Sequence, residues 1–147
     1  MKAKSAKAKG NKLENYIADK LRSKGIDKRA NRDGASGAGT REKGDIITSA
    51  SIFGRNLGIE AKNHKVAHIK DWWEQAQKLE VLGREPILVY KLERETYEET
   101  KAVIYLDTLL DMVKALMNNK EDNTFVPEKS DNSYVKQQIK FWTNKIK

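Results

Sequence analysis

The sequence contains no cysteine and no long hydrophobic run. The absence of cysteine excludes a disulfide framework and a thiolate zinc site, so an intracellular setting is the simpler expectation. A membrane span needs about 20 consecutive apolar residues, and no segment comes close to that length. No apolar segment follows the basic start Met1-Lys2-Ala3-Lys4, so we expect no secretory signal.

The chain is instead rich in charge, and the charge is positive. Its 147 residues suit one compact domain, and 29 Lys and Arg against 21 Asp and Glu give a net charge of +8. Such a field favours polyanions such as nucleic acid or an anionic membrane, although solubility alone is an alternative reason for it. The excess lies near the start, because residues 1–12 carry five lysines and no acid.

Composition and periodicity divide the chain into three parts. Residues 1–11 read as a basic flexible arm, residues 12–119 as the main folded domain, and residues 120–147 as a loop followed by an amphipathic helix. In that last helix Tyr134, Val135, Ile139, Trp142 and Ile146 lie near one face, and they must pack on this domain or across a dimer.

Within the main domain the pattern predicts an α/β fold with a central mixed β-sheet flanked by helices. A helix is expected over residues 12–24, a glycine-rich loop over 31–44 and an antiparallel hairpin formed by residues 45–48 and 56–61, with Gly54-Arg55 as its turn. The remaining expected elements are a short strand within 27–32, a helix over 67–82, strands over 86–92 and 102–106, and a helix capped by Asp107 that runs to about Met117.

Two acids and a lysine stand at positions where that hairpin brings them together. Glu60 and Lys62 are two residues apart and project from the same face of their strand, while Asp45 lies on the strand expected to pair with it. Two carboxylates and the Ala61 carbonyl make a hard oxygen site suited to Mg²⁺ or Mn²⁺. A lysine beside that metal can orient and help deprotonate a water that attacks a phosphodiester. The alternative is that Glu60 and Lys62 form an ordinary solvated strand face.

The order of these residues resembles the PD-(D/E)xK nuclease superfamily. Asp45 follows a glycine, and Glu60-Ala61-Lys62 supplies the Glu-x-Lys of the signature; Gly44 stands where the family name has proline. The helix segment Lys12-Leu13-Glu14-Asn15 and the loop from Arg32 to Gly39 narrow the resemblance to archaeal-type Holliday junction resolvases and their phage-encoded relatives. The pattern runs from Gly10 to about Leu92, and Trp72-Trp73-Glu74-Gln75 is similar to the phage-like variants.

The resemblance implies a restriction-endonuclease-like core with a C-terminal helical extension, and it implies a role for each matching residue. Asp45 and Glu60 would bind the metal, with Glu14 and the Ala61 carbonyl completing the site, and Lys62 would assist the nucleophilic water. Ser36 would lie near the scissile phosphate. Arg32 and Arg41 would contact phosphates, and Gln75 would contact the site or the DNA, although a surface amide is an equally good reading of Gln75.

Histidine and tryptophan supply further candidates. His64 and His68 are four apart, but residues 63–66 read as loop and no third ligand lies nearby, so metal binding by this pair is not favoured. Trp72 and Trp73 point about 100° apart on a helix, so one belongs in the core and the other suits base stacking or a dimer interface.

The function that follows is a Mg²⁺-dependent, structure-selective DNA endonuclease, acting as a homodimer on four-way (Holliday) junctions. Two-fold symmetry of the junction matches a two-fold dimer with one site for each of two opposed strands. A restriction-like or nicking nuclease of the same fold is the alternative within the enzymes. A non-catalytic basic nucleic-acid-binding module is the alternative outside them.

Overall fold

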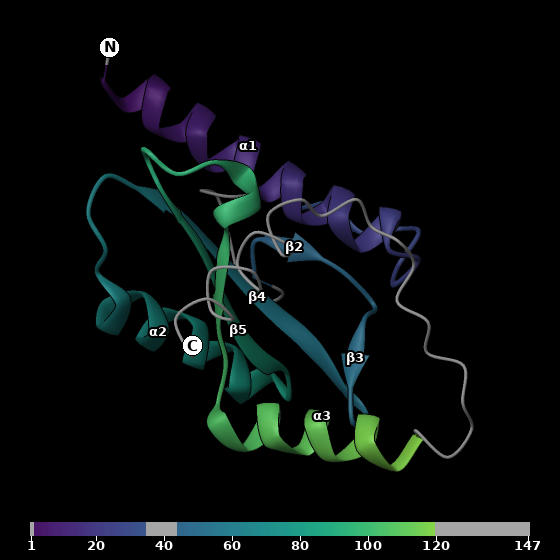
Figure 1. Ribbon diagram of the computed structural model, residues 1–147. Helices are drawn as coiled ribbons and strands as arrows, with labels where there is room; N and C mark the ends of the chain where they lie inside the picture. The colour runs from purple at the N-terminus through teal and green to yellow at the C-terminus, as the bar shows by residue number, and fades with distance from the viewer. Residues whose placement is uncertain (1, 35–43, 120–147) are drawn as a thin grey trace, which may run out of the picture. The chain divides into compact units, whose positions relative to one another are not determined.

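A computed structural model describes residues 2–34 and 44–119, with side chains from Ser5 onward. The chain divides into two units, Met1–Ile104 and Tyr105–Lys147. In the described parts the elements, in chain order, are α1 (Lys2–Ser23), β1 (Asn31–Arg32), β2 (Ile46–Ile47), β3 (Ser51–Ile52), β4 (Arg55–His64), α2 (Ile69–Gln77), η1 (Lys78–Leu82), β5 (Glu85–Leu92), η2 (Tyr97–Glu99), β6 (Lys101–Val103) and α3 (Leu106–Asn118). Figure 1 shows the elements of each unit.

The first unit is built on a four-stranded mixed sheet with the order β3-β4-β5-β6, which confirms the predicted α/β class. Strands β4 and β5 are parallel over the whole length of β5, from Leu57 opposite Glu85 to His64 opposite Leu92. The outer pairs, β3 with β4 and β5 with β6, are antiparallel. The crossover between the parallel strands is α2 with η1, which ends at Gly83 in the left-handed conformation (φ 72°).

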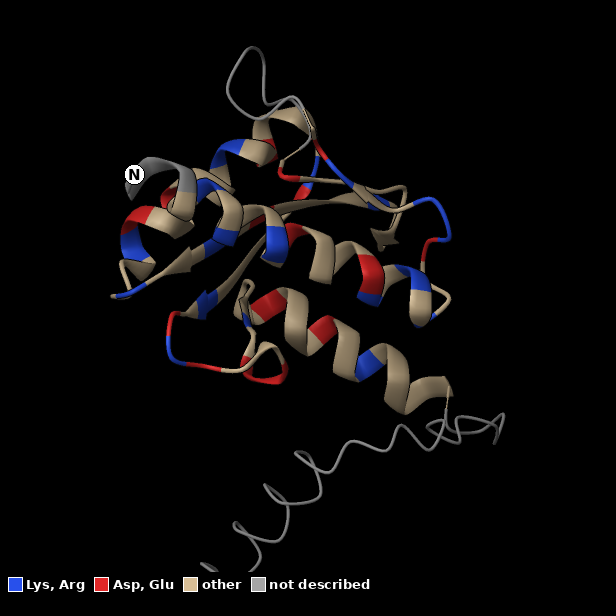
Figure 2. Ribbon diagram, turned by 90° about the horizontal axis from the view of Figure 1, so that it is seen from above, with Lys and Arg blue, Asp and Glu red and all other residues tan. Residues whose placement is uncertain are grey.

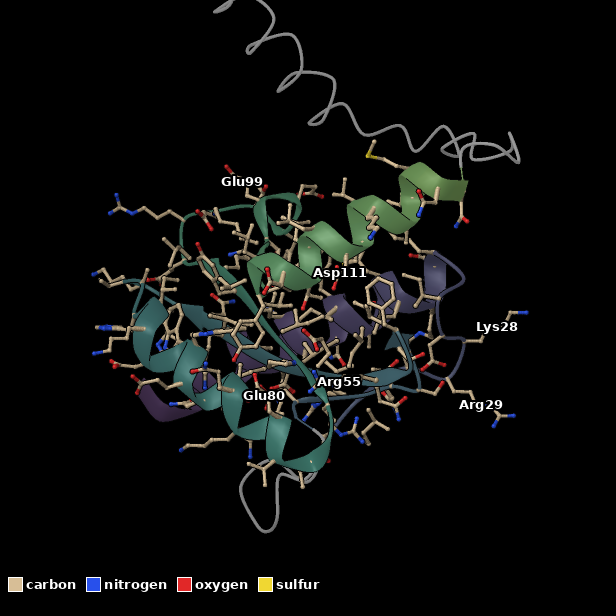
Figure 3. All side chains as sticks on the ribbon, turned by 90° about the horizontal axis from the view of Figure 1, so that it is seen from below. Lys28, Arg29, Arg55, Glu80, Glu99 and Asp111 are labelled. Atoms are coloured by element: carbon tan, nitrogen blue, oxygen red, sulfur yellow. The ribbon has the colours of Figure 1, made fainter. Side chains whose placement is uncertain are left out.

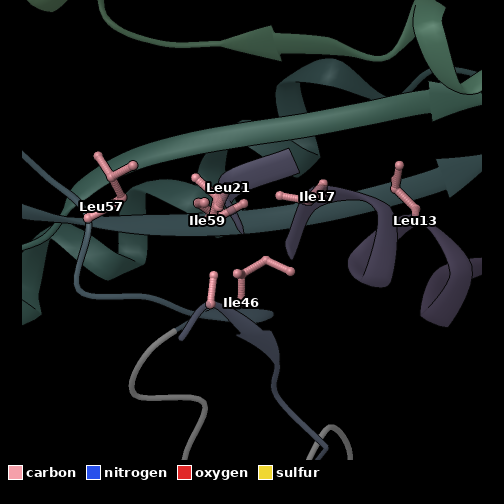
Figure 4. Packing of buried hydrophobic residues seen from close by; sticks show 8 residues of the cluster. Leu13, Ile17, Leu21, Ile46, Leu57 and Ile59 are labelled. Carbon is pink, nitrogen blue, oxygen red and sulfur yellow. The ribbon is translucent and has the colours of Figure 1, made fainter. Parts of the chain in front are cut away.

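Two clusters of apolar side chains lie on the two faces of the parallel strands. On one face, Ile59 of β4 packs with Leu13 and Ile17 of α1 and with Ile46 of β2 (Figure 4). On the other face, Leu88 of β5 packs with residues of α2 and the ends of the strands. Because side chains alternate along a strand, β5 contributes to both clusters, with Ile87 and Val89 on the first face and Leu88 and Tyr90 on the second.

Helix α1 begins ten residues earlier than the sequence pattern suggested. The segment expected to be a flexible arm is helical from Lys2, so α1 runs as one helix of 22 residues to Ser23. Alanine and lysine, which dominate residues 2–9, are among the best helix formers, and this propensity outweighs their mutual repulsion. The first acidic residue of α1 is Glu14, so the N-terminal half of the helix carries positive charge only (Figure 2).

The predicted hairpin between residues 45–48 and 56–61 does not form. Residues 46–47 pair instead with β1, antiparallel, and the hairpin partner of β4 is β3, across the turn Phe53-Gly54. Both turn residues have positive φ, 49° and 79°, as two-residue hairpin turns of the primed types require. The segment before β2 reaches β4 from the other direction, since Gly44 bridges Ile59 in a parallel sense.

The second unit contributes α3 to the described residues. The helix begins at Leu106 with Tyr105 as its N-cap, so Asp107 lies in the first turn rather than at the cap. An acid in that turn still interacts favourably with the helix dipole. The loop and helix predicted for residues 120–147 lie outside the described residues, as does most of the glycine-rich loop. No helix in the described parts of the chain is long and apolar enough to cross a membrane.

Candidate active site

Asp45 is held in place by backbone contacts on three sides. Its N–H donates to the Ile59 carbonyl at 2.8 Å, and its own carbonyl accepts from the Asp33 N–H at 2.8 Å. Its carboxylate oxygen Oδ2 accepts from the Ala61 N–H, also at 2.8 Å. The residue is buried, with 6% of its surface exposed. The acid that the sequence singled out is therefore fixed against β4 at the point where the Glu-x-Lys motif begins.

Gly44 makes this close approach possible. Its φ of +80° lies in the left-handed region, and a Cβ at this position would stand 2.5 Å from the Ile59 carbonyl oxygen. Neither an L side chain nor the fixed φ of proline fits here. The glycine before Asp45 is thus required by the local backbone rather than being a casual substitute for proline.

Glu60 and Lys62 lie on one side of β4 and form an ion pair. The Lys62 Nζ is 2.8 Å from Glu60 Oε1, and their side chains are 16% and 6% exposed, respectively. A buried carboxylate is costly unless a cation or hydrogen bonds compensate it. The pair is thus part of the interior and not the solvated strand face that was the alternative reading.

Glu14 reaches the site from α1, one residue after Leu13, which is fully buried in the core. Its carboxylate is also buried, and Arg32 of β1 places Nε 3.4 Å from Glu14 Oε2. Arg32, expected to contact phosphate, is therefore next to one of the site acids. This ion pair connects α1 with β1 beside the site, and the spacing of Glu14 and Arg32 in the sequence did not predict it.

Two cavities lie along β4. The larger, of about 610 Å³, is lined by Glu14, Asp45, Ala61 and Lys62 together with the N-terminal turns of α1 and the loops after β4 and β5. The smaller, of about 310 Å³, is lined by Glu60 and Gly44 and by residues of α2 and η1, Gln75 among them. Gln75, the predicted glutamine of α2, thus faces the same space as Glu60.

The predicted residues are brought to one region, but not into one compact ligand set. In the described ranges, no three acidic or histidine side chains are grouped so that they could hold a metal ion. The reason is the division just described: Glu60 lies with Lys62 and lines the smaller cavity, whereas Glu14 and Asp45 line the larger one. Ser36 and Arg41 fall outside the described residues.

The donor chemistry nevertheless fits a hard divalent cation. Three carboxylates, Glu14, Asp45 and Glu60, are all less than 10% exposed within a protein of net charge +8. Two of them lie beside buried or half-buried cations, Arg32 and Lys62. Oxygen donors and the absence of sulfur ligands suit Mg²⁺ or Mn²⁺ rather than zinc.

The histidines and tryptophans lie on α2 or next to it. His64, at the end of β4, lies with its ring centroid 5.1 Å from that of Trp72, and His68 precedes the first turn of α2, so the two histidines are not on one helix face. Burial lowers the pKa of His64, and the neighbouring Lys62 and His68 lower it further. Trp72 is buried in the core, and the half-buried Trp73 packs against the same cluster.

Sequence reasoning missed Glu93 as a part of this region. Its carboxylate accepts from Lys9 Nζ at 2.5 Å, across 84 positions of the sequence. Hydrogen bonding to Lys9 and its charge lower the pKa of Glu93. Glu93 follows β5 directly, and only the parallel β4–β5 pairing brings this end of β5 beside the end of β4.

A comparison with protein families shows which family the chain belongs to. Residues 5–147 match the family described as "Phage putative PDDEXK endonuclease". The chain belongs to this family. No curated protein and no solved structure matches it significantly. The matched residues make up almost the whole chain, including α3 and the residues after it. Membership of this family makes the protein a PD-(D/E)xK nuclease with DNA as its substrate.

Proposed function

We propose that this nuclease is a divalent-metal-dependent endonuclease that cuts four-way DNA junctions as a homodimer. The observation that carries the proposal is the placement of Asp45 against the Glu60-Ala61-Lys62 segment, with Glu14 entering from α1. This is a buried acidic site with a lysine, in a chain whose family is one of endonucleases.

In this proposal Asp45 and Glu60 hold Mg²⁺, with Glu14 and the Ala61 carbonyl as further oxygen donors, and Mn²⁺ can substitute. The bound ion would neutralise charge that develops on the phosphate. Binding it requires the Glu60 carboxylate to share or leave its contact with Lys62, which the flexible lysine stem allows.

Lys62 then orients a water and takes part in its deprotonation. Its ammonium lies 2.8 Å from the Glu60 carboxylate, so its positive charge stands beside the proposed metal ligands, where it would favour the hydroxide form of that water. Gln75 faces Glu60 from α2 and positions the site or the DNA. Arg32, Ser36 and Arg41 are proposed to contact phosphates, with Arg32 also holding Glu14 in its present position.

The substrate is proposed from symmetry. A four-way junction offers two equivalent strands, and each protomer supplies one site of the kind described, so a two-fold dimer cuts both strands. We place this activity inside a cell, in recombination or repair of phage or host DNA. Its competitors are a nicking or restriction-like enzyme of the same fold and a DNA-binding module without catalysis.

The test uses labelled four-way junction, linear duplex and single strand, each incubated with the full chain in Mg²⁺, in Mn²⁺ and in EDTA. Paired nicks confined to the junction and abolished by EDTA support the proposal. Asp45→Asn and Glu60→Gln should remove cleavage and leave junction binding intact or tighter, because repulsion of phosphate falls.

Other outcomes separate the competitors. Metal-dependent cleavage of duplex or single strand at the same rate as junction contradicts junction selectivity. Binding without cleavage in either metal contradicts the nuclease, and loss of binding with retained turnover in Asp45→Asn contradicts the assigned site.

A further inference from the structure

We propose that residues 5–11 of α1 form a wall along which one DNA strand lies as it enters the active-site cleft. The inference rests on the proposed nuclease function and adds to it the path of the substrate backbone. It comes from a helix that the sequence did not predict, since residues 5–11 were expected to be a flexible arm.

The same cleft that holds Glu14 and Asp45 is lined by this part of α1. Ala6 and Gly10 precede Glu14 at intervals of four residues, so the three share one helix face, and all of them line the cleft. Ala6 and Gly10 leave that face nearly without side chains, which lets a phosphodiester backbone lie close against the helix.

Gly10 has no structural reason to be glycine. A Cβ added there would have no atom of the described residues within 4 Å. Glycine inside a helix costs about 1 kcal/mol relative to alanine. A residue that destabilises its helix and fills no packing need, on the wall of a cleft beside the catalytic acids, is consistent with space kept for a ligand.

Lysines lie on both sides of the cleft, next to the helix face that Ala6 and Gly10 leave with small side chains. Lys7 and Lys9 line the cleft from α1, and Lys62 and Lys65 line it from the end of β4. By contrast, Lys12 is exposed on α1 and does not line the cleft. A chain of phosphates is the ligand that fits lysines on two walls of one groove.

Two contacts of Lys9 tie the wall to the ends of β4 and β5. Its ammonium is 2.5 Å from Glu93, and its carbonyl accepts from Asn63 Nδ2 at 3.4 Å. Both groups of the ion pair are exposed by more than 40%, so a phosphate can replace Glu93 at low cost. In the proposed complex Lys9 exchanges its Glu93 carboxylate for DNA phosphate.

The experiment measures binding of a fluorescent four-way junction and a duplex by anisotropy, in EDTA and over a series of salt concentrations. Lys7→Gln and Lys12→Gln remove one positive charge each from the same helix. We expect Lys7→Gln to weaken binding and to reduce the slope of log K against log salt by about one, and Lys12→Gln to resemble the unsubstituted protein.

Two further variants probe the bare face and the ion pair without removing a lysine. Gly10→Leu should keep the helix, as circular dichroism and thermal unfolding would show, and still weaken binding and slow cleavage several-fold. Gly10→Ala is its control and should be at least as stable as the unsubstituted chain. Glu93→Gln should tighten binding, because Lys9 no longer has a competing carboxylate.

The results distinguish this inference from the proposed function. One result would contradict the wall alone: the unsubstituted chain cleaves DNA, Lys7→Gln and Lys12→Gln bind DNA with the same affinity, and Gly10→Leu binds as the unsubstituted chain does. The proposed nuclease activity would then remain supported. If the Lys7 and Gly10 effects appear but no metal supports cleavage, the wall stands as a DNA surface and the proposed activity fails. Failure of the unsubstituted chain to bind any DNA overturns both.

Discussion

At the scale of single residues, the positions that matter most are those where the backbone leaves no freedom. Gly44 is one, because its positive φ and its contact with the Ile59 carbonyl place Asp45. Figure 3 shows the opposite kind of residue, Lys28 and Arg29, whose side chains extend outward from the turn after α1. Substitution at such exposed positions is expected to change stability little.

Gly44→Ala should destabilise the fold by about 1–3 kcal/mol and remove cleavage, because the new methyl group would meet the Ile59 carbonyl and displace Asp45. Urea unfolding and a single-turnover assay would measure the two effects. Gly25→Ala is a matched control: Gly25 also has positive φ, 69°, but a Cβ there has open space around it. Equal behaviour of the two variants would show that the close approach is unimportant.

Lys62→Ala should slow the chemical step about 10²-fold or more, the usual range for a positioned proton-transfer group. The substitution also leaves Glu60 without its buried cation, so unfolding must be measured beside single-turnover rates. Lys70→Ala, at an exposed position of α2, is the control for loss of a positive charge. An unchanged single-turnover rate in Lys62→Ala would show that this lysine has no part in the reaction.

Asp27 gives a prediction about acid stability. The Thr48 hydroxyl and the N–H groups of Ser49 and Arg29 hydrogen-bond its carboxylate and lower its pKa from 3.8 to about 2, with burial opposing them. A depressed pKa means that the unfolded chain takes up the proton first as the pH falls. The stabilisation is therefore complete above pH 3.8 and lost as the pH approaches 2.

Asp27→Asn tests this linkage by denaturant unfolding at several pH values. The variant should be less stable than the unsubstituted chain at neutral pH, and the difference should shrink between pH 4 and pH 2. A difference that stays constant over this range would show that the Asp27 carboxylate is not the group responsible.

At the scale of elements, α1 links stability to the site. Its face from Leu13 to Leu21 belongs to the main core cluster (Figure 4). The neighbouring Glu14 lines the cleft. One helix thus carries core residues on one face and an acid proposed for catalysis on the next, so we expect a packing defect in α1 to affect cleavage.

Leu13→Ala should cost about 2–5 kcal/mol, the range for large-to-small changes at fully buried positions. It should also reduce cleavage at temperatures where the protein remains folded, since Glu14 is the next residue. Chemical unfolding and cleavage rates at low temperature separate the two effects. Lys12→Ala, on the exposed side of the same turn, should change neither by much. Normal activity in folded Leu13→Ala would show that Glu14 is positioned independently of the core.

At the scale of the whole molecule, the proposed homodimer makes a prediction about paired cutting. Mixed dimers of the unsubstituted chain and Glu60→Gln, separated by two affinity tags, should nick one strand of a cruciform plasmid and yield open circles. Unsubstituted homodimers should yield linear product within one binding event. Linear product at the same rate from purified mixed dimers, or a monomer by sedimentation, would contradict the paired arrangement.

Local patterns in the sequence were enough to predict the class of the fold, and they supplied the candidate residues of the site. The α/β order, the mixed sheet and the segment Glu60-Ala61-Lys62 followed from periodicity, spacing and family resemblance, because these signals are local in the chain. Glu14, Asp45 and Glu60 are all buried in the structure. Their catalytic roles remain predictions.

The way in which these residues meet depends on contacts between segments that are distant in the chain. The antiparallel pairing of residues 45–48 with β4 was a reasonable expectation from proximity in sequence, yet β1 takes the place of β4 as the partner of β2, and Asp45 meets β4 through a parallel bridge at Gly44. Contacts such as Arg32 with Glu14 and Lys9 with Glu93 join positions far apart in the chain. Strand pairing depends on the free energy of the whole core, which no local pattern contains.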